Sequence, residues 1–149
     1  MTKNDSIIIN NQLQDILKVM AVIERCAAEA PLSVDVENAL SLSVDELLTN
    51  IISYGYADSE THQISVDLYL ENDEKTGKKA IALKITDDGI EFNPLNSKEV
   101  DLDIPLEEKK IGGLGIHLVK RLMDELIYER LDDKNILTLK KVLNNIKEN

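Results

Sequence analysis

Residues 87–94, DDGIEFNP, follow the apolar run IALKI at residues 81–85 and decide how the rest of the sequence is arranged. This order places the carboxylate of Asp87 at the end of a strand. At that point Gly89 lets the backbone turn sharply and lets a flat ligand approach it closely. A second glycine stretch, GGLGI at residues 112–116, opens an amphipathic segment, and a glycine-rich turn that leads into a helix is an anion site. The two stretches together predict a nucleotide site, with Asp87 at the base and the glycines at the phosphates.

A polar connection, residues 95–111, joins the two glycine stretches. Its length is that of a mobile cover over a bound ligand. Its acidic residues fall between Glu99 and Glu108, and we interpret them as the surface of this cover. Docking of a partner protein on these residues is the alternative.

The length of 149 residues is that of one domain, which we expect to span residues 1–149 and to bury a hydrophobic core. Aromatic residues make up only 3% of the chain, so the core must consist mainly of Leu, Ile and Val. Lys and Arg number 17 against 28 Asp and Glu, which gives a net charge of −11. This charge repels phosphates and argues against direct contact with nucleic acid or with an anionic membrane. It fits a basic protein partner, or serves only to keep the protein in solution.

Cys26 is the only cysteine, so the chain can form no intrachain disulfide and no metal cluster of thiolates. We interpret it as a small core residue rather than a reactive thiol, because it lies near the apolar face of a predicted helix. The N-terminus has no basic segment followed by an apolar one, and no apolar run approaches the roughly 20 residues of a membrane span. A cytoplasmic location is therefore the expectation.

The spacing of apolar residues predicts an α+β protein. Helices are expected at residues 12–30, 33–53 and 114–126, strands at 6–10, 63–70, 80–86, 126–130 and 136–142, and a turn at 132–135. Ser33 can cap the second helix and Gly55 can end it. This order most simply gives a two-layer sandwich, in which a mixed, mainly antiparallel sheet carries its helices on one face. The ligand would lie between the helices and the sheet.

Glu46 and Asn50 lie four residues apart in the second predicted helix and therefore project from one face. Ala39 and Ser43 continue this face with small side chains. An acid and an amide beside small residues, in a helix that is otherwise apolar, suggest the lining of a pocket. A solvent-exposed face is the alternative interpretation.

Three motifs resemble those of the GHKL ATPase superfamily, which has the Bergerat or histidine-kinase-like ATPase fold. ELLTN at residues 46–50 resembles the N box, and Asp87-x-Gly89, followed by FNP at residues 92–94, resembles the first glycine box. GGLGIHLV at residues 112–119 resembles the second glycine box. With its short connection between the glycine boxes and no appended domain, the chain is most similar to the anti-sigma-factor serine/threonine kinases of bacteria.

Two positions depart from the motifs of this superfamily. Glu91 stands where members often carry a second glycine, and the difference concerns the rim of the base pocket. Tyr54 stands where the N box commonly continues to a His, so no role for that His is expected here. Neither departure removes the residue that would bind a magnesium ion.

The resemblance implies a role for each matching residue, with ATP and Mg²⁺ as the cofactors. Asn50 would ligate a Mg²⁺ ion that bridges the phosphates, since an amide oxygen is a hard ligand suited to this ion. Glu46 would be the catalytic residue, a general base that accepts the proton of a serine or threonine hydroxyl or orients water. Asp87 would accept a hydrogen bond from the adenine amine, and Gly89 would leave room for the ring. Backbone amides of the second glycine box would hold the phosphates, and the remaining cofactor-binding residues implied are Phe92, Gly112, Gly113, Leu114, Gly115, Ile116 and Thr138, the last near the adenine.

The function implied by the resemblance is that of an ATP-binding anti-sigma regulatory factor with protein serine/threonine kinase activity. Such a transferase regulates transcription by phosphorylating an anti-anti-sigma partner of the STAS type and by sequestering a sigma factor. A homodimer is implied as well, formed through the first helix and the edge of the first strand. A non-catalytic nucleotide-dependent switch is one alternative. A detached histidine-kinase catalytic domain is another, although the chain has no helical hairpin that bears a phospho-acceptor histidine.

The two histidines, His62 and His117, suggest no catalytic triad and no histidine-metal site from the sequence. His117 lies just inside the helix after the glycines, where a surface or capping role is the expectation. Asp88, next to Asp87, is expected to be solvated.

Overall fold

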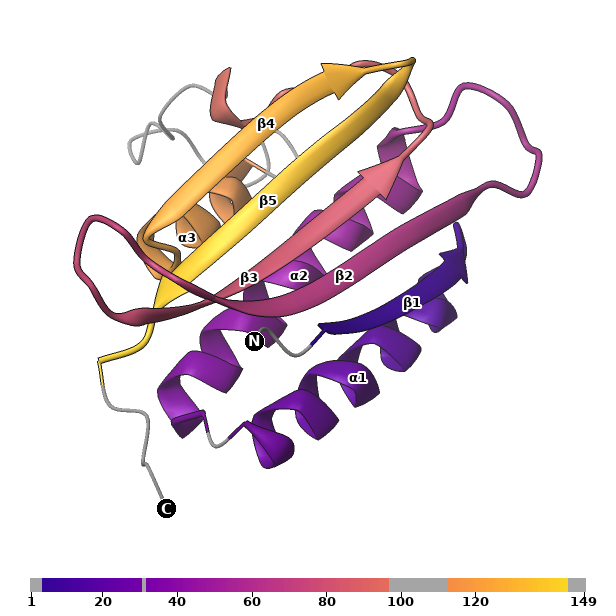
Figure 1. The fold of residues 1–149 in the computed structure, drawn as a ribbon. Helices are drawn as coiled ribbons and strands as arrows, with labels where there is room; N and C mark the ends of the chain where they lie inside the picture. Colours follow the sequence, from indigo (N-terminus) through magenta and orange to yellow (C-terminus); the bar gives the residue numbers. More distant parts are fainter. Residues whose placement is uncertain (1–3, 31, 97–112, 145–149) are drawn as a thin grey trace.

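The computed structural model describes residues 4–30, 32–96 and 113–144 (Figure 1). In these residues the α-helices are α1 (Ile16–Glu29), α2 (Val34–Tyr54) and α3 (Gly113–Leu122), and short 3₁₀ turns are η1 (Leu13–Asp15) and η2 (Pro94–Asn96). The strands are β1 (Asn4–Asn10), β2 (Gln63–Asn72), β3 (Lys79–Asp87), β4 (Glu125–Leu131) and β5 (Lys134–Val142). Figure 1 shows the three helices together on one side of the sheet, with α1 next to β1.

The five strands form one sheet in the order β1-β2-β3-β5-β4, and each pair of neighbours is antiparallel. The α+β fold class and the placement of helices on one face are therefore confirmed. β3 lies at the centre of the sheet, between β2 and β5, and its last residue, Asp87, pairs with Asn135 of β5. The chain enters the sheet at one edge with β1 and reaches the other edge with β4.

The core lies between this sheet and the helices, as the apolar spacing predicted. Along β2 the side chains of Ile64, Val66 and Leu68 are buried, while the alternate residues are half-buried. Leu40, Val44 and Leu48 of α2 are fully buried in the same core. This alternation is that of a sheet covered on one face only.

Ser33 begins α2, as predicted, because its side-chain oxygen accepts a hydrogen bond of 3.2 Å from the Val36 amide. The helix ends at Gly55, whose amide donates to the Ile51 carbonyl at 2.8 Å. Among the helices that the structure describes, none combines the length and the apolar character needed to cross a bilayer.

The last helix ends earlier than predicted, at Leu122 rather than residue 126. The cause is pairing with β5: the Asp124 amide donates to the Lys140 carbonyl at 2.9 Å, and the Asp124 carboxylate accepts from the Val142 amide at 2.7 Å. Strand pairing thus overrides a helical apolar spacing that continues into β4.

A two-residue turn joins β4 to β5 and fixes the register of the last two strands. Asp132 and Asp133 have φ of 51° and 61°, the left-handed pair typical of a type I′ hairpin turn, which Asp tolerates better than most residues. Leu131 then pairs with Lys134. The predicted turn at 132–135 is therefore shorter, and Asn135 lies within β5.

A charged contact holds the opposite end of the sheet, at the turn between β2 and β3. Asp73 is buried and accepts hydrogen bonds from the Lys140 ammonium at 2.8 Å and from the Thr76 hydroxyl at 2.6 Å. These contacts, that of Lys140 first, lower the pKa of Asp73 to about 2.

We expect the stability that depends on Asp73 to be lost in acid. Because its pKa is lowered in the folded state, the contribution is present above the unfolded value near 3.8 and disappears as the pH falls toward about 2. Urea unfolding at several pH values should show Asp73→Asn less stable than wild type at pH 7, with the difference shrinking below pH 4. Asp133→Asn, an exposed carboxylate in the other hairpin, is the control. A difference that is the same at pH 7 and pH 3 would contradict this assignment.

Candidate functional site

Asp87 ends β3 with its side chain buried, only 5% exposed. Its Oδ1 atom accepts hydrogen bonds of 2.9 Å from the Gly89 amide and of 2.9 Å from the Asn135 side chain. Within the described residues, both hydrogen bonds of this carboxylate end on Oδ1. The second oxygen, Oδ2, is therefore the acceptor that remains for a donor from outside the chain.

The surroundings of Asp87 stabilise its charged form less well than water does, so its pKa is raised. Burial, the largest cause, raises the pKa of the Asp87 carboxyl above its ordinary value, while the hydrogen bonds from Asn135 and Gly89 oppose this shift. Arg130 adds a positive charge nearby and donates to the Gly89 carbonyl at 2.9 Å. A further donor on Oδ2 would stabilise the charged form of this carboxylate.

Asn135 forms hydrogen bonds with Asp87 and with several groups around it. Its amide nitrogen donates to Asp87 and, at 2.8 Å, to the Ile90 carbonyl. Its carbonyl oxygen accepts from the Tyr128 hydroxyl at 2.6 Å and from the Phe92 amide at 3.3 Å. Asn135 thus links β3, β4 and the segment after Gly89 through one buried side chain.

The assignment of Thr138 to the adenine end of the site needs correction. In the pairing of β3 with β5, Asp87 lies opposite Asn135, whereas Thr138 lies opposite Lys84. Side chains alternate along a strand, so Thr138 points to the opposite face from Asn135 and from the buried Leu137 and Leu139. Asn135 is the β5 residue beside Asp87, and only the exact length of the hairpin turn could have revealed it in the sequence.

Gly89 packs against the end of α2. A Cβ atom added to Gly89 would overlap the carbonyl oxygen of Gly55, and the same carbonyl accepts from the Ile90 amide at 2.8 Å. Position 89 therefore requires glycine because its backbone lies against the backbone of Gly55, whether or not a ligand binds. The first glycine stretch is docked on the carboxyl end of the N-box helix.

Glu46 and Asn50 meet on the half-buried face of α2. The Asn50 amide nitrogen donates to Glu46 Oε1 at 3.2 Å, which leaves the amide oxygen as an acceptor. Gly115, in the first turn of α3, lies directly against the Glu46 carboxylate, and a Cβ atom added there would overlap it. The N box and the second glycine stretch are thus in contact, as the nucleotide hypothesis requires.

The helix α2 sets the spacing between the two halves of the site. Glu46 contacts Gly115, and nine residues later Gly55 contacts Gly89. At a rise of 1.5 Å per residue these two points are about 14 Å apart along the helix. An extended ligand with unlike ends can lie along such a helix, with one end at Glu46 and Asn50 and the other at Asp87.

The remaining residues predicted to bind the nucleotide differ in burial, and one of them is not described by the structure. Phe92 is half-exposed and contributes its backbone amide to Asn135. Gly113 is the first residue of α3, and Leu114 follows it in the helix. Ile116 is 2% exposed and belongs to the hydrophobic core, so its side chain packs rather than faces a ligand. Gly112 and most of the polar connection lie outside the described residues.

Comparison with known proteins gives one family and several relatives. A family model described as histidine kinase-like ATPase domain matches residues 9–141. The serine/threonine-protein kinase BtrW of Bordetella bronchiseptica is 31% identical over 100 residues, which are 67% of this chain and 66% of that protein. The serine-protein kinase RsbW of Listeria monocytogenes is 26% identical over 104 residues, 67% of this chain and 62% of the relative. RsbW of Halalkalibacterium halodurans is 28% identical over 107 residues, 69% and 59% of the two chains. The match therefore spans about three fifths to two thirds of these curated relatives.

Replacing Asn135 should test its place in this network. Asn135→Ala removes the donor to Asp87 and the acceptor for the Tyr128 hydroxyl, so the free energy of unfolding should fall by about 1–3 kcal/mol. Thr138→Val, three positions along the same strand, should change it by less than about 0.5 kcal/mol. Urea unfolding measures both, and equal losses in the two variants would argue against the role given to Asn135.

Proposed function

The chain belongs to the histidine kinase-like ATPase domain family, and on that premise we propose that it is an ATP-dependent protein serine/threonine kinase that acts as an anti-sigma regulatory factor. The observation that carries the proposal is the contact of Glu46 with both Asn50 and Gly115, which joins the N box to the second glycine stretch. Relatives named as serine-protein kinases support the reaction class.

The adenine end of ATP is assigned to Asp87. Its Oδ1 atom is held by Gly89 and Asn135, so Oδ2 can accept a hydrogen bond from the exocyclic amine of the base. An acceptor fixed in this way recognises a base that presents a donor at that position and disfavours one that presents an acceptor. Phe92, half-exposed near this end, is assigned to the rim of the base site.

The phosphate end is assigned to the start of α3 and to Asn50. The first turn of a helix presents unpaired amides and a positive dipole end, both of which favour an anion. Asn50 fits a Mg²⁺ ion, since its nitrogen is engaged by Glu46 and its oxygen remains as a hard ligand. When bound, this ion would neutralise charge on the phosphates. Gly112, Gly113, Leu114, Gly115 and Ile116 would contribute backbone amides at this end.

Glu46 is assigned as the general base. It lies against Gly115, at the phosphate end, where it can accept the proton of a serine or threonine hydroxyl as that oxygen bonds to the γ-phosphorus. The bond from this phosphorus to the bridging oxygen breaks, and ADP leaves. Asn50 holds the Glu46 carboxylate in place by its hydrogen bond.

The proposed partners are a STAS-type anti-anti-sigma protein, as the phosphorylated substrate, and a sigma factor. The net charge of −11 suits a basic protein surface on the partner. A homodimer is proposed through β1 and α1. Three exposed apolar side chains support it: Ile8 on the edge strand, Leu13 in η1 and Leu17 on α1.

Replacing Glu46 separates the kinase from a nucleotide-dependent switch. Glu46→Gln keeps a hydrogen-bond acceptor for Asn50 but cannot take up a proton, so ATP affinity should hold while phosphoryl transfer to a STAS-type protein falls by about 10²–10⁴-fold. Transfer of labelled phosphate and calorimetric titration with ATP measure the two properties. Glu129→Gln, an exposed carboxylate on β4, is the control and should behave as wild type. Binding of ATP by the wild type without any transfer would favour the switch, and transfer to a histidine would favour a detached histidine-kinase domain.

Replacing Asp87 tests the adenine assignment. In Asp87→Asn the side-chain oxygen can still accept from Gly89 and Asn135, while a donor takes the place of Oδ2 and faces the adenine amine. ATP affinity should fall by about 1–3 kcal/mol, roughly 5- to 150-fold, as expected when one buried polar group is badly paired. Asp133→Asn removes the same charge from the nearby hairpin turn and should leave the affinity unchanged. If calorimetry shows equal affinity for Asp87→Asn and wild type, the base lies elsewhere.

A further inference from the structure

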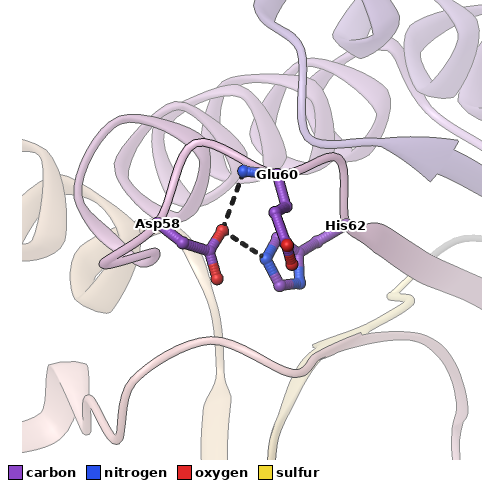
Figure 2. A group of neighbouring side chains, drawn as sticks. All are labelled: Asp58, Glu60 and His62. Carbon is purple, nitrogen blue, oxygen red and sulfur yellow. Dashed lines mark hydrogen bonds and ion pairs between the residues drawn. The ribbon is translucent and has the colours of Figure 1, made fainter.

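A group of side chains in the loop between α2 and β2 has no place in the nucleotide site. Asp58, Glu60 and His62 each present one potential metal ligand, and these atoms all lie within 4.8 Å of one another (Figure 2). The spacing Asp-x-Glu-x-His places them on a single short stretch of backbone. The three side chains are brought together by the shape of this loop, which could not be predicted from the sequence, so His62 was not expected to bind a metal.

The imidazole of His62 is held in one orientation. Its Nδ1 lies 3.1 and 3.2 Å from the two carboxylate oxygens of Asp88, and its Nε2 lies 2.8 Å from Asp58 Oδ1. The ring stacks on Tyr56, with centroids 4.4 Å apart and an interplanar angle of 20°. Asp88 is exposed to solvent, as expected from the sequence, and its carboxylate also pairs with His62.

The backbone of this loop is also fixed. The His62 amide donates to the Asn11 side chain at 2.8 Å, and the Asn11 amide donates to the His62 carbonyl at 2.9 Å. The Glu60 amide donates to Asp58 Oδ1 at 2.9 Å. These hydrogen bonds connect the backbone of the loop to the end of β1. The backbone would therefore need little further ordering when the three side chains bind an ion.

We propose that Asp58, Glu60 and His62 bind a divalent transition-metal ion, with Zn²⁺ as the best-suited probe. One imidazole with carboxylates favours Zn²⁺ and similar ions over Mg²⁺, which takes oxygen ligands. Metal–ligand bonds of about 2.0–2.2 Å place tetrahedral ligands about 3.4 Å apart, so a small closure of the observed group is enough. A water molecule would complete the coordination.

Asp88 would not bind the ion itself but would orient the His62 ligand through Nδ1. A histidine that ligates a metal through Nε2 commonly donates its Nδ1 proton to a carboxylate, which fixes the ring and makes the ligand more basic. The contact between His62 and Asp88 has this arrangement. When the ion binds Nε2 of His62, the Nε2 proton would pass to solvent, and Asp58, which accepts from Nε2 in this structure, would become a ligand of the ion.

A protonated His62 held between two carboxylates is the competing state. The hydrogen bonds to Asp58, the larger cause, and to Asp88 raise the pKa of His62 above its ordinary value. This state uses Asp58, His62 and Asp88, and its hydrogen bonds do not involve the Glu60 side chain. Dependence on Glu60 therefore distinguishes a metal site from an ion pair.

The test is calorimetric titration of the nucleotide-free chain with ZnCl₂ at neutral pH. We expect one equivalent to bind, with Asp88→Asn weakening the affinity by about 10- to 100-fold and Glu60→Gln weakening it by more. Glu74→Gln, an exposed carboxylate in the β2–β3 turn, is the matched control and should bind Zn²⁺ as wild type does. Absence of binding, or equal affinity in Glu60→Gln and wild type, would overturn the proposal.

A second measurement locates the ion without relying on affinity. The chain has only two histidines, so NMR of the imidazole nitrogens should show the His62 signals shifting with Zn²⁺ while those of His117 serve as the internal reference. Asn50→Ala should retain Zn²⁺ binding, since the proposed site does not include the N box. Loss of binding in Asn50→Ala, or shifts at His117 alone, would place the ion elsewhere and reject the site.

Discussion

The rest of the structure depends on two close contacts of α2 with glycines. At both glycines, Gly89 and Gly115, an added Cβ atom would overlap a neighbouring atom. The backbone of Gly55 touches Gly89, and the carboxylate of Glu46 touches Gly115. A larger residue at Gly89 would push the end of β3 away from this helix, and one at Gly115 would displace the Glu46 side chain. Before any ligand is considered, Gly89 is therefore required for the packing of two backbones, and Gly115 sets the position of the Glu46 carboxylate. Two acceptors are left for a ligand in the proposed site. Oδ2 of Asp87 is held in place by the hydrogen bonds to Oδ1, and the Asn50 amide oxygen is held by the hydrogen bond from the Asn50 nitrogen to Glu46.

Burying the Asp87 carboxylate costs free energy, and the fold offsets this cost only in part. Two donors occupy one oxygen, and Arg130 supplies a positive charge beside the turn. The raised pKa shows that burial still outweighs these contacts. A protein interior rarely leaves a carboxylate in this condition unless a further partner arrives. The residues that hold Asp87 come from β4, from β5 and from the segment after β3, so the position of its second oxygen depends on the pairing of these strands rather than on the local sequence alone.

The sequence predicted those features that depend on local pattern. The Ser33 cap, the apolar spacing of α1 and α2 and the strand at the centre of the sheet each follow from residues close together in the chain. The end of α3 and the role of Asn135 could not be predicted in this way, because both depend on the register of β5. That register is set by Asp132 and Asp133 in left-handed conformations, a two-residue turn in place of the four-residue turn expected from the composition of the stretch. The arrangement around His62 was missed for a similar reason, since Asp88 lies 26 residues further along the chain.

The net charge of −11 limits how such a site can bind a nucleotide. A free triphosphate would approach a field that repels it, and of the described side chains Arg130 lies near Gly89, at the end proposed for the base rather than for the phosphates. Backbone amides at the start of α3 carry only partial charge. On the proposed function, the magnesium complex of the nucleotide would carry less negative charge than the free nucleotide, and the Asn50 amide oxygen would bind its cation. An acidic protein with the proposed site would therefore take the metal complex in preference to the bare anion.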